Sequence, residues 1–253
     1  MTPGIPKARP DGRSELDRKT VGIIGGMGPA ATHAFFGQVI ALTDARTDQE
    51  HIHLIIDNDP QIPDRTAFLL GHGEDPVPRL VAAARRLEAA GCELLVMPCN
   101  TAAAFADQIG RTVSIPILDW TGVAADAAAR TSRAAVGILA TTGTIEAGLY
   151  RRALEDRGRR SIIPDAADQE TVMAVIYGPD GVKSGNDAGK GADELLGVAS
   201  RLVQRGAEAL LLACTELPLA LPATDPRWPV PALDPSLVVA ERVVVEAGAV
   251  LRT

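Results

Sequence analysis

Two cysteines, each at the end of an apolar run, are the residues of this 253-residue sequence best suited to chemistry. Cys99 follows residues 94–98 and Cys214 follows residues 209–213, and both runs have the length and composition of buried strands. If the two sulfur atoms faced one substrate, a thiolate on one side could remove a proton from a carbon. The thiol on the other side could then return a proton to the opposite face of the planar intermediate.

The two cysteines belong to a repeat that covers most of the chain. They lie 214 − 99 = 115 residues apart, and the same offset relates three further pairs of landmarks. These pairs are Gly91 with Gly206, residues 21–24 with 136–139, and residues 115–119 with 230–234. Four landmarks at one offset indicate two copies of one unit, each carrying one cysteine at the end of a strand.

Apolar and polar periodicity predicts alternating strands and helices in both copies. The first copy contains predicted strands at 20–24, 51–57, 94–98 and 115–119, and helices at 30–42, 76–90 and 101–109. The second contains strands at 134–139, 161–164, 209–213 and 230–233, and helices at 145–157, 167–177, 192–205, 215–221 and 235–251. Such alternation is typical of parallel sheets with helices on both faces, whose strand carboxyl ends face the ligand.

We therefore predict an α/β fold with two pseudo-symmetric parallel-sheet domains and an active site in the cleft between them. The predicted division is a flexible leader over residues 1–19, an N-terminal domain of residues 20–120 plus 233–253, and a C-terminal domain of residues 121–232. This arrangement would direct Cys99 and Cys214 at one another across the cleft. We expect the helix that follows each cysteine to stabilise a thiolate, because a helix N-terminus carries partial positive charge.

The cysteines have other interpretations. As metal ligands they are too few, and no Cys-x-x-Cys or neighbouring His accompanies them. A redox pair is a poorer match because each cysteine lies in a different copy, and a lone nucleophile would need a His, yet no histidine occupies a repeated position. Both could also be small buried residues that end strands. Cys92, whose repeat position is Ala207, is interpreted as structural.

Five motifs in order carry a resemblance to a known family. They are residues 25–29 (GGMGP), 62–66 (IPDRT), 98–102 (PCNTA), Tyr177 to Lys183 with Gly185, and 214–218 (CTELP). The chain resembles the cofactor-independent aspartate/glutamate racemase superfamily, and more narrowly its aspartate racemase branch. The resemblance extends from about residue 20 to the C-terminus. It implies that Cys99 and Cys214 are the catalytic acid and base.

We predict substrate-binding roles for Met27, Arg65, Asn100, Thr101, Thr144, Lys183, Thr215 and Glu216, and the resemblance implies these roles for Arg65, Asn100, Thr101, Lys183 and Thr215. Asn100, Thr101 and Thr215 would hold the amino and α-carboxylate groups. Arg65 and Lys183 would hold the side-chain carboxylate, because Arg offers a planar fork and Lys a point charge.

Several of these side chains have simpler interpretations. Arg65 could pair with Asp64, and Lys183 could be a solvated loop lysine. Glu216 could tune Cys214, contact the substrate ammonium, or be an exposed first-turn carboxylate favoured by the helix dipole.

The residues around these motifs leave further questions open. Thr141 and Thr144 could reach the ligand or cap the following helix. Position 103 is Ala where the family often has His. The glycine-rich loop 178–191, with Lys183 near its middle, suggests a mobile lid.

Three other functions compete with racemisation. Residues 26–31 fit the loose Gly-x-Gly-x-x-Ala pattern of a dinucleotide site, although the acidic residue expected about 20 positions later is poorly matched. A related enzyme acting on a diacid, either a decarboxylase or a cis–trans isomerase, would tend to use one cysteine. A non-catalytic amino-acid or peptide-binding protein would keep the cleft but not need both thiols.

Composition limits the partners. The net charge of −7 argues against nucleic acid or an anionic membrane, and no apolar segment is long enough to span a bilayer. Three cysteines form no disulfide framework, so we expect a cytoplasmic protein. We expect no metal and no cofactor, since no lysine stands at a strand end to carry pyridoxal phosphate. The expected substrate is a small acidic amino acid, aspartate before glutamate, and the resemblance suggests a homodimer.

Overall fold

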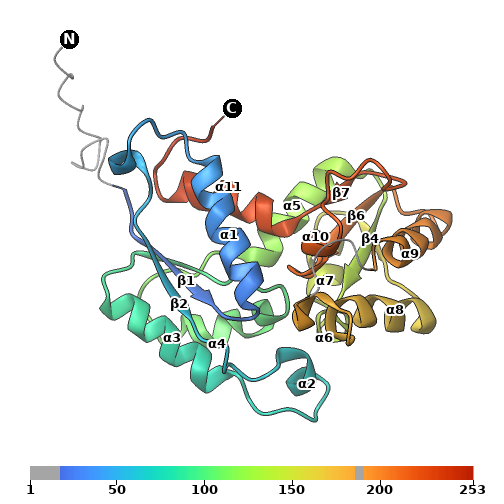
Figure 1. Cartoon of the computed structure of the whole chain (residues 1–253), viewed down its shortest axis with the longest axis horizontal. Coiled ribbons are helices and arrows are strands. Elements are labelled where there is room, and N and C mark those ends of the chain that lie inside the picture. The colour runs from blue at the N-terminus through green and yellow to red at the C-terminus, as the bar shows by residue number, and fades with distance from the viewer. Residues whose placement is uncertain (1–17, 186–190, 253) are drawn as a thin grey trace.

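Two separate parallel β-sheets form the framework of the protein. The structure, a computed structural model, describes residues 18–185 and 191–252, so residues 1–17 of the predicted leader lie outside the described residues. Each sheet is the centre of one of the two lobes seen in Figure 1. The predicted α/β class with two parallel-sheet units is confirmed. No helix in the described ranges is long and apolar enough to cross a membrane.

The first lobe is built on a three-stranded sheet of order β2-β1-β3. Its strands are β1 (Val21–Gly25), β2 (Leu54–Asn58) and β3 (Leu94–Val96). Its helices are α1 (Pro29–Leu42), α2 (Arg65–Leu69), α3 (Val77–Ala89) and α4 (Ala106–Gly110), with the 3₁₀ helices η1 (Asp48–Glu50) and η2 (Thr101–Phe105).

The second lobe is built on a four-stranded sheet of order β5-β4-β6-β7. Its strands are β4 (Ala135–Ala140), β5 (Arg160–Ile162), β6 (Ala209–Ala213) and β7 (Ala232–Leu233). The remaining helices are α5 (Trp120–Thr131), α6 (Thr142–Glu146), α7 (Leu149–Glu155), α8 (Ala166–Tyr177), η3 (Val182–Ser184), α9 (Ala192–Gln204), α10 (Leu217–Ala220) and α11 (Pro235–Glu246).

Strand register confirms the repeat. Val21 pairs with Leu94 in the first sheet and Val136 with Ala209 in the second, so both partners are shifted by 209 − 94 = 115 residues. The bridge between Leu95 and Ile117 corresponds in the same way to the pairing of Leu210 with Ala232. The two sheets therefore have the same strand order, and each cysteine follows the equivalent strand of its lobe.

Several predicted elements were wrong in extent. The predicted strand 115–119 is only a single bridge at Ile117, because Pro116 has no N–H to extend the ladder. The predicted helix 145–157 is interrupted at Gly148, which has a φ of +62°. The predicted helix 101–109 starts as a 3₁₀ turn, and the last helix ends at Glu246. Helix α5 was not predicted.

The last helix of each copy covers the sheet of the other copy. Helix α11 packs against α1 over the first sheet, through Val239 and Val243. Helix α5 packs against α7 over the second sheet, through Ala124 and Ala128. This exchange is visible where α11 crosses to α1 in Figure 1. The domain boundaries themselves stay a prediction.

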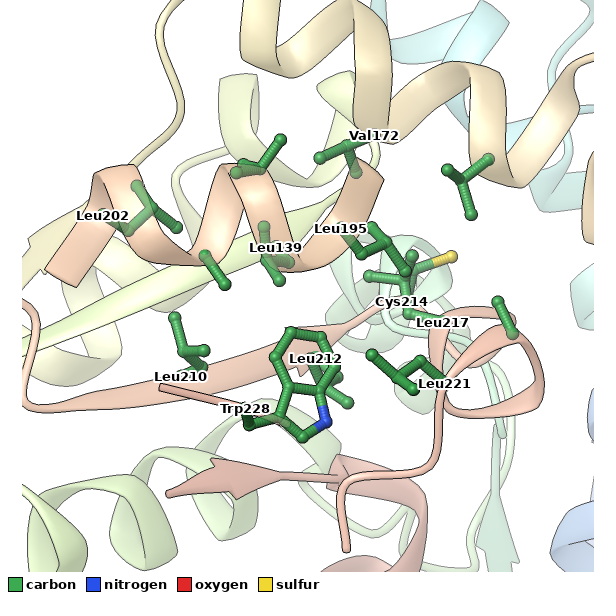
Figure 2. Close-up of a cluster of buried hydrophobic side chains, with 14 of the residues drawn as sticks. Leu139, Val172, Leu195, Leu202, Leu210, Leu212, Cys214, Leu217, Leu221 and Trp228 are labelled. Atoms are coloured by element: carbon green, nitrogen blue, oxygen red, sulfur yellow. The ribbon is translucent and has the colours of Figure 1, made fainter. Parts of the chain in front are cut away.

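The core of the second lobe holds one of the two cysteines in place. Figure 2 shows leucine side chains from β4, β6 and α9 packed around Trp228, with Cys214 at one end of the cluster. Since every residue of β6 is buried, the position of this sulfur is set by the packing of the strand that precedes it.

A methyl group in the middle of β4 is expected to destabilise the fold. A Cβ on Gly137 would lie 2.8 Å from Leu210 Cδ2, 3.2 Å from Ala207 Cβ and 3.3 Å from Leu202 Cβ. We expect Gly137→Ala to lower the free energy of unfolding by about 1–3 kcal/mol, measured by urea denaturation. The control Gly37→Ala, in helix α1 with nothing within 4 Å, should stabilise the protein by up to about 1 kcal/mol. Equal effects would contradict the packing argument.

Candidate active site

Both predicted cysteines line one small cavity between the lobes. Cys99 and Cys214 are each 5% exposed and reach the cavity from the carboxyl ends of β3 and β6. The other lining residues are Met27, Arg65, Asn100, Thr101, Thr141, Tyr177, Lys183, Thr215 and Glu216. Of the predicted substrate-binding residues, this cavity therefore brings together all but Thr144.

Thr144 lies behind the cavity and orders the residues that line it. The hydroxyl of Thr101 is 2.9 Å from that of Thr144 and 3.0 Å from that of Thr141, and the last two are 3.0 Å apart. Thr141 also caps helix α6 by accepting a hydrogen bond from the Thr144 N–H. Thr141 can therefore cap the helix and also line the cavity. Thr144 does not line the cavity, and its hydroxyl instead lies within hydrogen-bond distance of the hydroxyls of Thr101 and Thr141.

Arg65 is a buried cation held by backbone carbonyls. Its side chain is only 7% exposed, and its guanidinium donates to the carbonyls of Ile62 at 3.1 Å, Pro63 at 2.9 Å and Met27 at 3.3 Å. Nε has no hydrogen-bond partner, and no carboxylate of the described residues forms an ion pair with this side chain. A buried guanidinium without an anion is a ready site for a substrate carboxylate.

The surroundings of Arg65 keep it charged. Burial lowers its pKa, but the electrostatic interactions with the nearby Cys99 and Asp64 outweigh this effect and raise the pKa above the ordinary value. Asp64 does not form the ion pair that the simpler interpretation of Arg65 required. It accepts from the Ala67 N–H at the start of α2 and from the Tyr177 hydroxyl. Arg65 therefore places a positive charge beside Cys99.

Glu216 is the centre of the hydrogen bonding on the opposite side. It is 3% exposed, and its Oε1 accepts from Lys183 Nζ at 2.5 Å and from the Gly28 N–H at 3.2 Å. Its Oε2 accepts from Cys214 Sγ at 3.1 Å and from the Thr215 hydroxyl at 3.0 Å. The interpretation of this residue as an exposed carboxylate is wrong. The bond from Gly28 also occupies an N–H of the turn that would have cradled a dinucleotide.

Burial and the charge on Glu216 together keep Cys214 protonated. Burial raises the pKa of Glu216, but the charge of Lys183 and the hydrogen bonds it receives bring that pKa below its ordinary value. Burial and the adjacent Glu216 charge hold the pKa of Cys214 well above the usual range. The expectation that a helix dipole makes this cysteine a thiolate is not met in the free protein, because burial and the Glu216 charge outweigh the effect of the four-residue helix α10. Cys214 is a neutral thiol that donates to Glu216.

Replacing Glu216 with glutamine is expected to lower the pKa of Cys214, because it removes the negative charge nearest the sulfur. In a Cys99→Ser background, the ultraviolet thiolate absorbance should appear at lower pH in Glu216→Gln, with a shift of about one pH unit or more. Cys92 is the internal reference, since burial alone raises its pKa. An unchanged titration would show that burial, and not Glu216, sets the state of Cys214.

Asn100 lines the cavity, and its amide is held by hydrogen bonds from two other side chains. Its Oδ1 accepts from Trp120 Nε1 at 2.9 Å and from the Tyr150 hydroxyl, which fixes the orientation of the amide. Nδ2 is buried without a partner. Burial raises the pKa of Tyr150, so its phenol remains a donor. Sequence reasoning missed Trp120 and Tyr150, which lie on other helices and carry no motif.

Lys183 is less exposed than a solvated loop lysine. Its side chain is 21% exposed, and Nζ lies 5.6 Å from the centroid of the Tyr177 ring. Burial lowers its pKa, but the charge of Glu216 more than offsets this and raises it. The predicted lid over residues 178–191 includes residues 186–190, which lie outside the described residues, so the lid stays a prediction.

Other chemistry-bearing residues lie elsewhere. Cys92 is 3% exposed, does not line the cavity, and lies near Gly22, as Ala207 lies near Gly137 in the other lobe. Ala103 lies outside the lining of the cysteine cavity. Across residues 18–185 and 191–252, no cluster of three or more His, Cys, Asp or Glu side chains could hold a metal ion.

Fold and site together define a two-lobed α/β protein with a thiol pair and a buried cation around one closed cavity. Residues 24–243 match the model of the Asp/Glu/hydantoin racemase family, and the chain belongs to that family.

Proteins of known structure or function match nearly the whole chain. The structure of an aspartate racemase from Picrophilus torridus is 31% identical, covers 92% of this chain and 96% of its own, and superposes with a TM-score of 0.81. A broad specificity amino-acid racemase, RacX, of Bacillus subtilis is 26% identical over 230 residues, which are 88% of this chain and 96% of that protein. A glutamate racemase from Francisella tularensis, solved with D-glutamate, is 17% identical over 90% of this chain and 81% of its own, with a TM-score of 0.66, and shares the fold.

Proposed function

We propose that this protein interconverts the L and D forms of aspartate, and also accepts glutamate, by proton transfer between Cys99 and Cys214 without pyridoxal phosphate. The observation that carries the proposal is the cavity that both sulfur atoms line together with Arg65. Membership of the racemase family and the likeness to an aspartate racemase support it. Homodimeric assembly and a cytoplasmic location stay predictions.

The proposed mechanism uses one thiol as base and the other as acid. A thiolate on one side removes the α-proton and leaves a planar carbanion, and the thiol on the other side donates its proton to the opposite face. The product has inverted configuration, and the two sulfur atoms have exchanged protonation states. Because the α-proton is a very weak acid, the site must stabilise the carbanion strongly by fixed donors in a dry cavity.

Described side chains supply those donors. In this proposal the Nδ2 of Asn100 and the hydroxyls of Thr101 and Thr215, which line the cavity, hold the α-carboxylate and the amino group. Arg65, beside Cys99 and without a carboxylate partner among the described residues, supplies charge for the side-chain carboxylate. In the proposed reaction Cys214 starts as the acid, because its thiol is hydrogen-bonded to Glu216.

Racemisation of a wider range of amino acids is a second candidate. A larger outer cavity beside the site is lined in part by the apolar side chains of Pro29, Pro60, Ile62 and Val182, and RacX of Bacillus subtilis is described as a broad specificity enzyme. An outer wall of this kind could accept a longer or neutral side chain.

One experiment tests both candidates. The purified protein is incubated in D₂O with the L and D forms of aspartate, glutamate and alanine, and optical rotation and α-deuterium are followed by polarimetry and NMR. Racemisation of aspartate well above alanine is the expected result. Equal rates would favour the broader activity, and absence of α-deuterium from all of them would refute both.

A further inference from the structure

The cysteine cavity is closed to an amino acid in this structure. Its volume is about 10 Å³, close to the space that one water molecule needs, whereas the adjoining outer cavity has a volume of about 560 Å³. Met27, Arg65, Lys183 and Glu216 line both cavities, so their side chains form the partition between them. A substrate that arrives in the outer cavity must displace part of this partition to reach the sulfur atoms.

The partition is held by an ion pair between two of these residues. Lys183 Nζ donates to Glu216 Oε1, which also accepts from the Gly28 N–H. Arg65 donates to three backbone carbonyls and lies beside Cys99, and it forms no ion pair with a carboxylate of the described residues. Lys183 and Arg65 are the two cations expected to hold a substrate's side-chain carboxylate. Lys183 is already paired with the carboxylate of Glu216.

We propose that Glu216 is an internal competitor for the substrate's side-chain carboxylate: its own carboxylate holds Lys183 and closes the partition until an acidic substrate takes its place. The identity of that substrate rests on the proposed function. Exchange of one carboxylate for another keeps Lys183 paired. A neutral side chain offers no such exchange and leaves a buried ammonium without an anion, which is costly. Glu216 is in this way a specificity-determining residue.

Competition of this kind weakens the apparent affinity for every dicarboxylate. If the open state is a minor one, the measured dissociation constant exceeds the intrinsic constant by the inverse of the open fraction. Removing the Glu216 carboxylate removes this penalty, and the affinity for a dicarboxylate must then increase even though a buried charge has been lost.

Calorimetric titration with succinate tests this directly, because succinate has two carboxylates and no amino group. Glu216→Gln should bind succinate at least about tenfold more tightly than the parent protein. Propionate, with one carboxylate, should show a smaller gain. Asp59→Asn is the matched control, since Asp59 is a nearby carboxylate that pairs with Arg79 and does not contact Lys183. Its affinity for succinate should not change.

A second variant guards against misfolding of the first. Position 216 corresponds in the repeat to Thr101, so Glu216→Thr introduces a residue that the other lobe already carries. Glu216→Thr should give the same increase in succinate affinity as Glu216→Gln. Adding Lys183→Met to either variant should abolish this increase. Unchanged or weaker succinate binding in both position-216 variants would overturn the inference even if aspartate is racemised. Tighter succinate binding in a protein that racemises no amino acid would sink the proposed function and leave the competitor role standing.

Discussion

Replacing either Cys99 or Cys214 with serine is expected to reduce kcat/KM for aspartate racemisation by about 10²–10⁴-fold, because a hydroxyl is a far weaker acid than a thiol. Both sulfur atoms line the same cavity, one from each lobe. Since the equilibrium constant of a racemisation is one, the loss in kcat/KM must be equal in the two directions. Coupled assays that start from L-aspartate and from D-aspartate measure it.

Exchange of the substrate α-proton with solvent distinguishes the roles of the two cysteines better than the racemisation rates do. In D₂O, each single variant keeps one base on one side, so it should exchange the α-proton of only one enantiomer, and without inversion. The two variants should select opposite enantiomers. Exchange of both enantiomers by one variant and of neither by the other would mean that a single cysteine does all the chemistry.

Cys92 provides the control for both variants. It is buried like the other two, but its repeat position is Ala207 and it does not line the cavity. Cys92→Ala should therefore keep the racemisation rate and lose only a little stability. A large loss of activity in this variant would indicate that thiols matter here for packing rather than for proton transfer.

The repeat could be recognised from the sequence because buried parallel strands constrain every residue. A Cβ added to Gly22 or Gly137 would lie 2.8 Å from a leucine Cδ2, of Leu95 and Leu210 respectively, so a side chain at either position would force its neighbours to move. Packing constraints of this kind keep apolar runs and glycines at equivalent positions in the two copies, 115 residues apart. That offset predicted that the two lobes repeat one unit, and the strand register confirms the repeat.

The parts of the site that sequence could not predict depend on side-chain direction. Whether a glutamate two residues after a cysteine faces solvent or the sulfur is a matter of burial and rotamer, and here Glu216 faces the sulfur. The helix-dipole expectation for Cys214 failed because this nearer charge acts on a buried thiol. The Asn100 amide is likewise fixed by Trp120 and Tyr150, which are distant along the chain.

Replacing Arg65 with methionine is expected to cost about 2 kcal/mol or more of transition-state binding for aspartate, at least about 30-fold in kcat/KM. The guanidinium is buried and pairs with no carboxylate of the described residues, so the substrate would be its anion. If Arg65 binds the side-chain carboxylate, the loss should be much smaller for alanine, which has none. If it serves only as the positive charge beside Cys99, both substrates should lose the same factor.

Arg79→Met is the matched control for the loss of an arginine near the site. Arg79 pairs with Asp59 at 3.1 Å, but its side chain is 46% exposed, and an ion pair of that kind contributes little. The kinetic constants of this variant should match those of the parent protein for aspartate and alanine alike. Steady-state assays of both variants with both substrates, after thermal melts have shown that each is folded, give the comparison. Equal kcat/KM for aspartate in Arg65→Met and Arg79→Met would remove the buried guanidinium from the site and with it the preference for acidic substrates.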